Sequence, residues 1–147
     1  MTDPSPRRSR EHALVLVALL AAPLVLLGLG RALEPDPRGW GTHEQLGFRP
    51  CTPMTRWNVP CPGCGVTTAL ALSARGAVPA AFRTQPLGPL LVLASLAAAG
   101  WALAGHRRGR DLADELAGLR WRFLAGLSGL LLLLAWLYKL AVVRGWP

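Results

Sequence analysis

The chain has 147 residues, of which 52% are hydrophobic and only 16% are charged, and its mean hydropathy is +0.33. Soluble domains are about one quarter charged, so this composition argues against a water-soluble domain. The net charge of +8 would indicate nucleic-acid binding in a soluble protein, but the arginines stand at the ends of apolar segments, where they serve as topology signals. We therefore expect a membrane protein that binds no nucleic acid.

Three apolar segments determine the predicted fold. They cover residues 12–30, 86–105 and 121–143, and each approaches or exceeds the roughly 20 residues that a helix needs to cross a hydrocarbon core of about 30 Å. Three such helices without a polar face would leave a soluble chain little to present to water. The sequence therefore predicts a single all-α integral membrane domain with three transmembrane helices in the lipid bilayer.

A basic tail, residues 1–11, precedes the first predicted span. A cleavable signal peptide is the alternative for this span, because Arg7, Arg8 and Arg10 resemble the basic region of such a peptide. No clean cleavage site of small residues follows Gly30, so we expect the helix to be retained.

The long segment between the first two spans has two parts. Residues 31–63 are rich in proline and glycine without periodicity, which predicts a loop, and loops of this length are commonly functional, disordered or cross-linked. Residues 64–85 have apolar side chains at helical spacing, such as Val66, Ala69 and Leu70. These pieces are too short to span a membrane, so we expect one or two short interfacial helices.

The distribution of arginines predicts the orientation. The tail and the link between the second and third spans carry eight basic residues in a short length: Arg7, Arg8, Arg10, Arg107, Arg108, Arg110, Arg120 and Arg122. The positive-inside rule therefore places the N-terminus and the basic loop 106–120 in the cytoplasm, and the loop 31–63 outside. Residues 144–147 form a short C-terminal end, and Lys139 just before it is expected to snorkel to the outer interface.

The candidate chemistry lies in the three cysteines, Cys51, Cys61 and Cys64. The sequence Cys61-Pro-Gly-Cys64 resembles the knuckles of zinc ribbons and rubredoxins, whose turn directs both sulfurs at one ion. A closed zinc site needs four ligands, and Cys51 together with His43 would complete an allowed set of three cysteines and one histidine. A single loop histidine is, however, more commonly a solvated side chain.

Two other interpretations of the cysteines remain open. A Cys-x-x-Cys pair at a helix start favours thiolate, so Cys61 could attack a disulfide with Cys64 as resolving thiol, although the βαβ context of such enzymes is missing. Alternatively, one structural disulfide staples the loop, which leaves an odd thiol.

The segment from GTHEQLGF through CPGCGVTT to QPLGPLL, residues 41 to about 91, resembles DUF2752, a bacterial membrane family of unknown function. The resemblance rests on a cysteine, a spacer and Cys-Pro-x-Cys-Gly-x-Thr, and it singles out Cys51, Cys61, Pro62, Cys64, Gly65, Thr67, Gly76 and Pro86. The chain has Thr68 and Gln85 where many members have arginine and asparagine. The resemblance implies a small helical membrane protein and supplies no activity.

These observations together predict a small multi-pass protein of the bacterial cytoplasmic membrane, and an enzyme is the less expected class. Its site of Cys51, Cys61 and Cys64, with His43 as the possible fourth ligand, would bind zinc or another thiophilic metal and organise the loop for contact with other membrane proteins. The alternatives are an accessory or scaffold subunit with a structural disulfide, and a thiol–disulfide redox protein.

Overall fold

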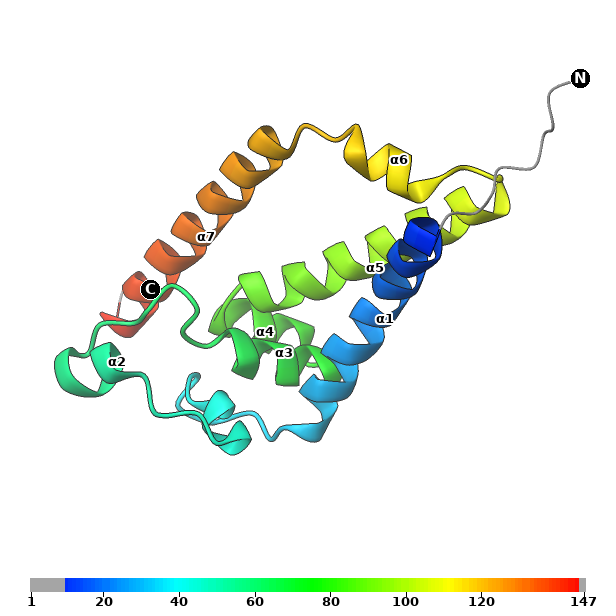
Figure 1. Cartoon of the computed structure of the whole chain (residues 1–147). Helices are drawn as coiled ribbons and strands as arrows, with labels where there is room; N and C mark the ends of the chain where they lie inside the picture. Colours follow the sequence, from blue (N-terminus) through cyan, green and yellow to red (C-terminus); the bar gives the residue numbers. More distant parts are fainter. Residues whose placement is uncertain (1–9, 146–147) are drawn as a thin grey trace, which may run out of the picture.

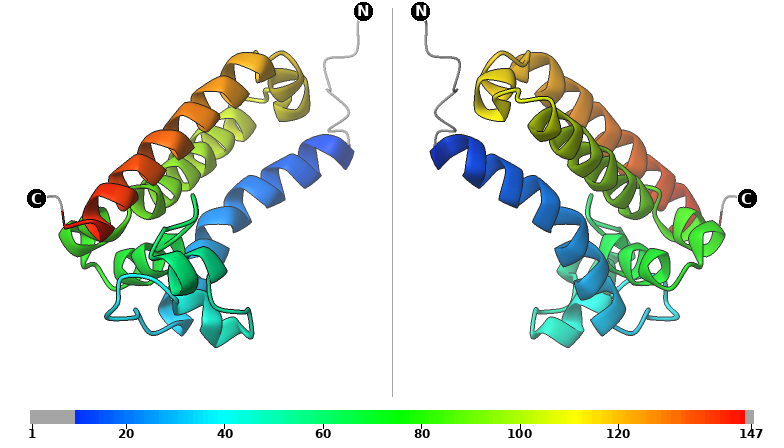
Figure 2. Two further views of the ribbon diagram at one scale, coloured as in Figure 1. Left: turned by 90° about the vertical axis from the view of Figure 1, so that its left-hand side faces the viewer. Right: turned by 90° about the vertical axis from the view of Figure 1, so that its right-hand side faces the viewer.

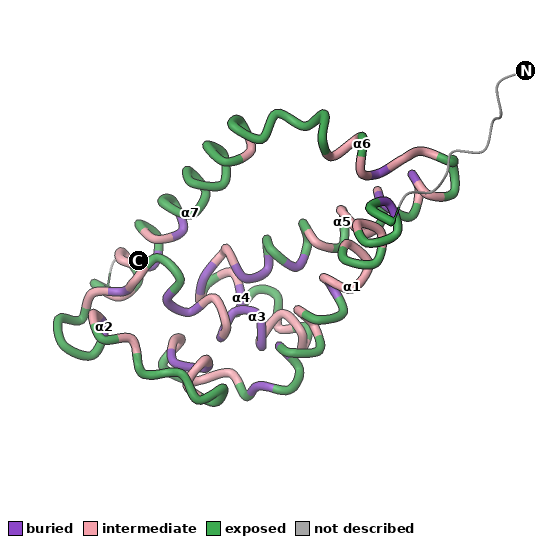
Figure 3. The backbone as a smooth tube through the Cα atoms, viewed as in Figure 1, coloured by how far each residue is buried: buried purple, intermediate pink, exposed green. Residues whose placement is uncertain are grey.

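The structure is a computed structural model that describes residues 10–145, and this part of the chain is helical without strands. Three helices, α1 (Arg10–Ala32), α5 (Leu87–Arg107) and α7 (Trp121–Val143), are long and apolar enough to cross a membrane. Most of their surface is exposed in the isolated chain, as expected for helices that face lipid (Figure 3). The predicted all-α membrane fold is thereby confirmed, whereas residues 1–9 of the basic tail lie outside the described residues.

Short helices fill the segments between the long ones. Two short helices, α3 (Val66–Ala74) and α4 (Val78–Thr84), lie where short helices were predicted, and the basic link contains α6 (Leu112–Ala117). The segment 31–63, for which we expected no regular structure, also contains a 3₁₀ helix, η1 (Thr42–Leu46), and α2 (Thr52–Trp57). Both are single short turns, and apolar periodicity is not detectable over so few residues.

The first half of the chain forms the packed part of the molecule. Helix α1 packs against α3 and α5, and α3 also packs against α4 and α5 (Figures 1 and 2). The centre of this packing is made of small side chains, with Ala69 and Ala71 of α3 fully buried and Val92 of α5 nearly so. Small residues allow the helix backbones to approach closely, which is how membrane helices gain dispersion energy without a hydrophobic driving force.

Helix α7 stands apart from this packed part. No residue between positions 121 and 134 is buried, and α7 runs from α6 back to the loop and helices that follow α1 (Figure 1). Its C-terminal third is anchored by side-chain hydrogen bonds to backbone carbonyls. Trp136 Nε1 donates to Pro60 O (2.8 Å), and Tyr138 Oη donates to Arg83 O (2.9 Å).

Lys139 provides the third anchor of α7, and its position corrects the sequence prediction. Its Nζ donates to Gly39 O (2.9 Å) and Thr84 O (3.1 Å), and only 3% of the residue is exposed. The expected snorkelling of Lys139 to the outer interface is therefore wrong. The loop folds over the end of α7 and offers carbonyl acceptors to the ammonium group. This contact between distant segments cannot be predicted from the position of a lysine in an apolar helix.

The opposite end of the molecule is held together by histidines. His12 of α1 makes a hydrogen bond through Nε2 with Nδ1 of His106 (3.1 Å), and the backbone N–H of Leu112 donates to His12 Nδ1 (3.1 Å). Arg110 forms an ion pair with Glu115 (2.8 Å) within the same link. These contacts fix α1, α5 and α6 to one another, so the basic link is folded onto the bundle rather than loose.

Replacing Gly88 by alanine should destabilise the packed part of the molecule. A Cβ on Gly88 would lie 2.5 Å from Ala69 Cβ and 3.2 Å from the Ala69 backbone carbon, so α3 and α5 would have to separate. We expect a loss of about 1–3 kcal/mol, the usual range for overpacking. Thermal unfolding of purified protein in detergent measures the loss. The matched control is Gly100→Ala in the same helix, where a Cβ meets nothing within 4 Å. Equal melting temperatures for the two variants would contradict the close approach.

Candidate metal centre

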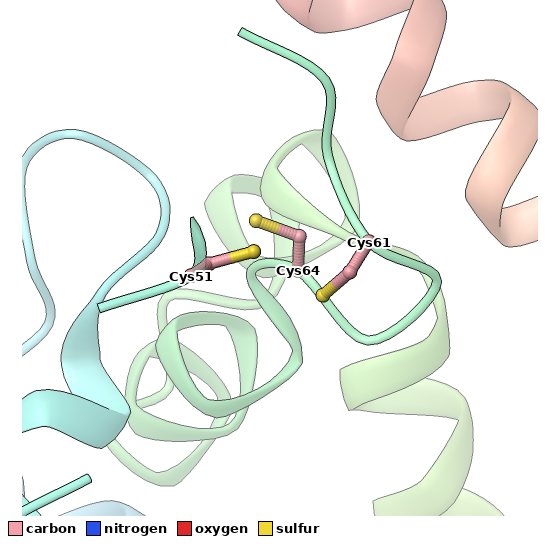
Figure 4. Close-up of side chains that lie close together, drawn as sticks. All are labelled: Cys51, Cys61 and Cys64. Carbon is pink, nitrogen blue, oxygen red and sulfur yellow. The ribbon is translucent and has the colours of Figure 1, made fainter. Parts of the chain in front are cut away.

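The structure brings the three cysteines together. Their sulfur atoms all lie within 4.8 Å of one another, although Cys51 is separated from the Cys61–Cys64 pair by α2. Figure 4 shows Cys51 reaching toward Cys64 from one side, with Cys61 and Cys64 on a single turn. Among the described residues, this is the group of metal-ligand side chains found close enough together to share one ion.

The turn from Cys61 to Cys64 follows from its proline and glycines. The N–H of Cys64 donates to the carbonyl of Cys61 (2.9 Å), which closes the turn. Gly65 follows with a φ of 88°, a conformation that side chains other than glycine rarely adopt. A Cβ at Gly65 would also lie 2.7 Å from Gly39 O, so only glycine lets the loop segment at Gly39 pass this close to the cysteine turn.

Helix α2 returns the chain so that Cys51 reaches the same place. Cys51 is the residue immediately before α2, and Asn58 ends the helix in the left-handed conformation with its N–H donating to Met54 O (3.1 Å). The N–H of Val59 also donates to Pro53 O (3.3 Å). The chain therefore reverses direction over α2, and this reversal brings the residues on either side of the helix next to each other.

His43 faces the same cavity but does not join the sulfur group. The cavity measures about 310 Å³ and is lined by His43, Cys51, Cys61, Gly63, Cys64 and Thr67. The ring Nε2 of His43 lies 3.3 Å from the carbonyl oxygen of Arg49. His43 is thus near enough to line the site, and its role as fourth ligand stays a prediction.

The three thiols differ in acidity. Burial, followed by the charges of Cys51 and Cys61, raises the pKa of Cys64 to about 12, and the ammonium group of Lys139 opposes this only in part. Burial and the neighbouring Cys51 also raise the pKa of Cys61. Burial would raise the pKa of Cys51, but hydrogen bonds from the Met54 and Cys61 backbone and from the Cys61 and Cys64 side chains together outweigh it, so this pKa is lowered. The most readily ionised thiol is therefore Cys51, whereas the redox hypothesis had assigned the attack to Cys61.

The donor set suits a thiophilic metal. Thiolates are preferred ligands of zinc and of soft ions such as Cu(I). With Zn–S bonds of about 2.3 Å, two sulfurs in a tetrahedral site are roughly 3.8 Å apart, so the three sulfurs need to close only slightly to share one ion. Three cysteines leave one position of a tetrahedral site open to a fourth ligand.

Two buried polar side chains, Gln85 and Thr68, bond the segments around the site to one another. Gln85 is fully buried and its Nε2 donates to Cys64 O (3.4 Å). Thr68, one turn into α3, shares a buried hydrogen bond with Thr42 of η1 (2.8 Å). These two positions are the ones at which the chain departs from the family pattern, and this departure was the available signal. The hydrogen bond between the threonines fixes η1, which carries His43, to the helix that starts at the cysteine turn.

Comparison with known proteins gives one match. The family model described as "Protein of unknown function (DUF2752)" matches residues 53–99, which confirms the resemblance noted in the sequence. The match covers about a third of the chain and includes Cys61 and Cys64, α3, α4 and the first part of α5. Cys51 and His43 precede the matched segment. Searches of curated proteins and of solved structures found no match.

The difference in acidity predicts the order in which the thiols are alkylated in metal-free protein. Thiolate is the reacting form, so a lowered pKa gives Cys51 the largest reactive fraction near pH 8, whereas Cys64, with a pKa near 12 and 4% exposure, should react last. Mass spectrometry after timed alkylation in detergent measures the order. In denaturant the three rates should converge. Equal rates for Cys51 and Cys64 in the folded protein would contradict the assignment.

Proposed function

We propose that this chain is a small multi-pass membrane protein that binds zinc or another thiophilic metal through Cys51, Cys61 and Cys64. The observation that carries the proposal is the meeting of three sulfurs within 4.8 Å, built from two separate segments of the loop. A loop that was stabilised only by one disulfide bond would require two cysteines. Here the third sulfur lies in the same group as the other two, which favours a ligand shared by all three.

The proposed role of the metal is to fix the loop for contact with other membrane proteins. Large apolar side chains flank the site and face outward, among them Phe48 (63% exposed) and Trp57 (67% exposed) on either side of Cys51. Exposed aromatic residues are enriched at protein interfaces and at membrane surfaces. A metal bound between Cys51 and the cysteine turn would hold this segment, including α2, in one conformation.

A thiol–disulfide exchange protein is the second candidate, and the lowered pKa of Cys51 is the observation that favours it. In this alternative the Cys51 thiolate attacks the disulfide of a partner protein and forms a mixed disulfide. The neighbouring Cys61 thiol, once ionised, then attacks the Cys51 sulfur. The products are a Cys51–Cys61 disulfide and the partner's reduced thiols, with both electrons passed to the partner.

We further propose that the protein lies in the bacterial cytoplasmic membrane with its N-terminus in the cytoplasm and its cysteine loop outside. The support is the arginine distribution, because the link with Arg107, Arg108, Arg110 and Arg120 lies at the opposite end of α5 from the cysteine loop (Figure 1).

Metal content tests the proposed site directly. Protein purified in detergent should contain about one thiophilic metal ion per chain, and each of Cys51→Ser, Cys61→Ser and Cys64→Ser should lose most of it, because an alcohol is a poor ligand for a soft metal. Elemental analysis together with thiol titration provides the measurement.

Thr67→Ala, which alters the same cavity without removing sulfur, is the matched control and should retain the metal. Metal-free wild-type protein with three reduced thiols, unable to take up Zn²⁺, would refute the proposal. A Cys51–Cys61 disulfide would support the redox alternative.

Thiol labelling in intact cells tests the orientation. After brief chelation, a membrane-impermeant maleimide should label Cys51, since the loop is proposed to face outward. A variant in which Cys51, Cys61 and Cys64 are all replaced by serine contains no thiol and provides the unlabelled baseline. On that background, a cysteine introduced at Arg108 of the basic link should be labelled only after the membrane is permeabilised. The reverse labelling pattern would place the loop in the cytoplasm.

A further inference from the structure

Lys139 is a buried cation that the proposed function does not yet use. It belongs to a membrane-spanning helix, where an ionisable side chain is costly and usually serves a site. Both hydrogen bonds found for its ammonium group go to neutral carbonyls, those of Gly39 and Thr84. Over residues 10–145, no carboxylate forms an ion pair with it. Carbonyl dipoles stabilise an ammonium ion, but they leave its net charge uncompensated.

The nearby groups that can become negatively charged are the thiols of the cysteine cluster. Its Nζ would lie 3.1 Å from a Cβ placed on Gly65, the residue directly after Cys64. Helix α7 passes beside the cysteine turn in Figure 4, and Trp136, one turn earlier, donates to Pro60 just before Cys61. The end of α7 therefore places one ammonium group beside the cysteine turn.

The charges of the thiolates, the metal ion and the Lys139 ammonium group can be added to find which ion gives a neutral assembly. Three thiolates carry a charge of −3, so a divalent ion bound by all three leaves a complex of −1. One ammonium ion at its edge makes the buried assembly neutral. A monovalent ion bound by the same three thiolates would leave −2, and the assembly would still carry one net negative charge. Because burying net charge is unfavourable, the arrangement favours a divalent ion over a monovalent one.

We propose that Lys139 is the counter-charge of the metal centre, a positioning residue that stabilises the divalent trithiolate complex and couples the third membrane helix to it. This inference rests on the proposed metal-binding function and deepens it by naming the charge class of the ion. Without the ion the ammonium group has only the carbonyls of Gly39 and Thr84 as hydrogen-bond partners among the described residues. With the ion bound it completes a neutral assembly. Lys139 therefore favours the metal-loaded state specifically.

The test compares Lys139→Met with the wild type, using the full chain in detergent and Zn²⁺ as the probe. Removal of a group that supports metal ligands commonly costs about 10–100-fold in affinity, and we expect a rise of that size in the Zn²⁺ dissociation constant. The matched control is Arg144→Met, which removes the same charge from an exposed position five residues later, just past the end of α7, and should leave the constant unchanged. Lys139→Gln, which keeps a hydrogen-bond donor without the charge, should behave like Lys139→Met, and Lys139→Arg should restore part of the affinity.

Thermal unfolding separates this role from a merely structural tether. The melting temperature of metal-loaded Lys139→Met should fall below that of the loaded wild type, while the metal-free variant should melt at the same temperature as the metal-free wild type or higher, because it no longer buries an uncompensated charge. If both forms are destabilised equally, or if Lys139→Gln binds Zn²⁺ like the wild type, Lys139 is only a tether and the inference is wrong. If wild type and Lys139→Met bind Zn²⁺ equally, the proposed role of Lys139 is wrong and the proposed metal site is retained. If the wild type binds no metal, both proposals are wrong.

Discussion

The structure depends on how an irregular loop is held at the end of a membrane bundle. Backbone carbonyls and amides near hydrocarbon need partners, and a segment rich in proline and glycine cannot provide all of them itself. Helix α7 supplies donors for this purpose, with Trp136, Tyr138 and Lys139 bonded to carbonyls of four different residues of the loop and short helices. Because the rest of α7 touches little else in the chain, these bonds connect the third span to the cysteine loop.

The cysteine cluster is a consequence of the same arrangement. The loop segment at Gly39 is bonded to Lys139 and also passes within reach of Gly65, so one contact point fixes the loop, α7 and the cysteine turn together. The hydrogen bond between Thr42 and Thr68 holds η1 to α3 in the same region. The three sulfurs thus meet where segments from widely separated positions in the sequence are bonded to one another, and the proposed metal would add a further link between Cys51 and the cysteine turn.

The sequence predicts the parts of this structure that depend on local pattern. The three spans and the two helices after Cys64 follow from apolar length and helical spacing, and residues Leu87–Arg107 and Trp121–Val143 match the predicted spans within about two residues. The cysteine turn follows from Cys61-Pro-Gly-Cys64. The burial of Lys139 and of Gln85 could not be predicted, because it results from the loop folding back over the ends of α7 and α5. The distance from His43 to the sulfurs likewise depends on tertiary contacts of η1.

The two ends of the molecule differ in where their basic side chains lie. At the end with the basic link, arginines remain near the surface, and a hydrogen bond between the rings of His12 and His106 joins the helices. At the other end a single lysine is buried together with ionisable thiols. The ammonium group of Lys139 is bonded to backbone carbonyls there, and in the proposed metal complex the thiolates of Cys51, Cys61 and Cys64 would supply the negative charge that balances it. Under this proposal the conformation of the loop, the charge at the end of α7 and the protonation of the sulfurs are linked, so a change in one of them should alter the stability of the other two.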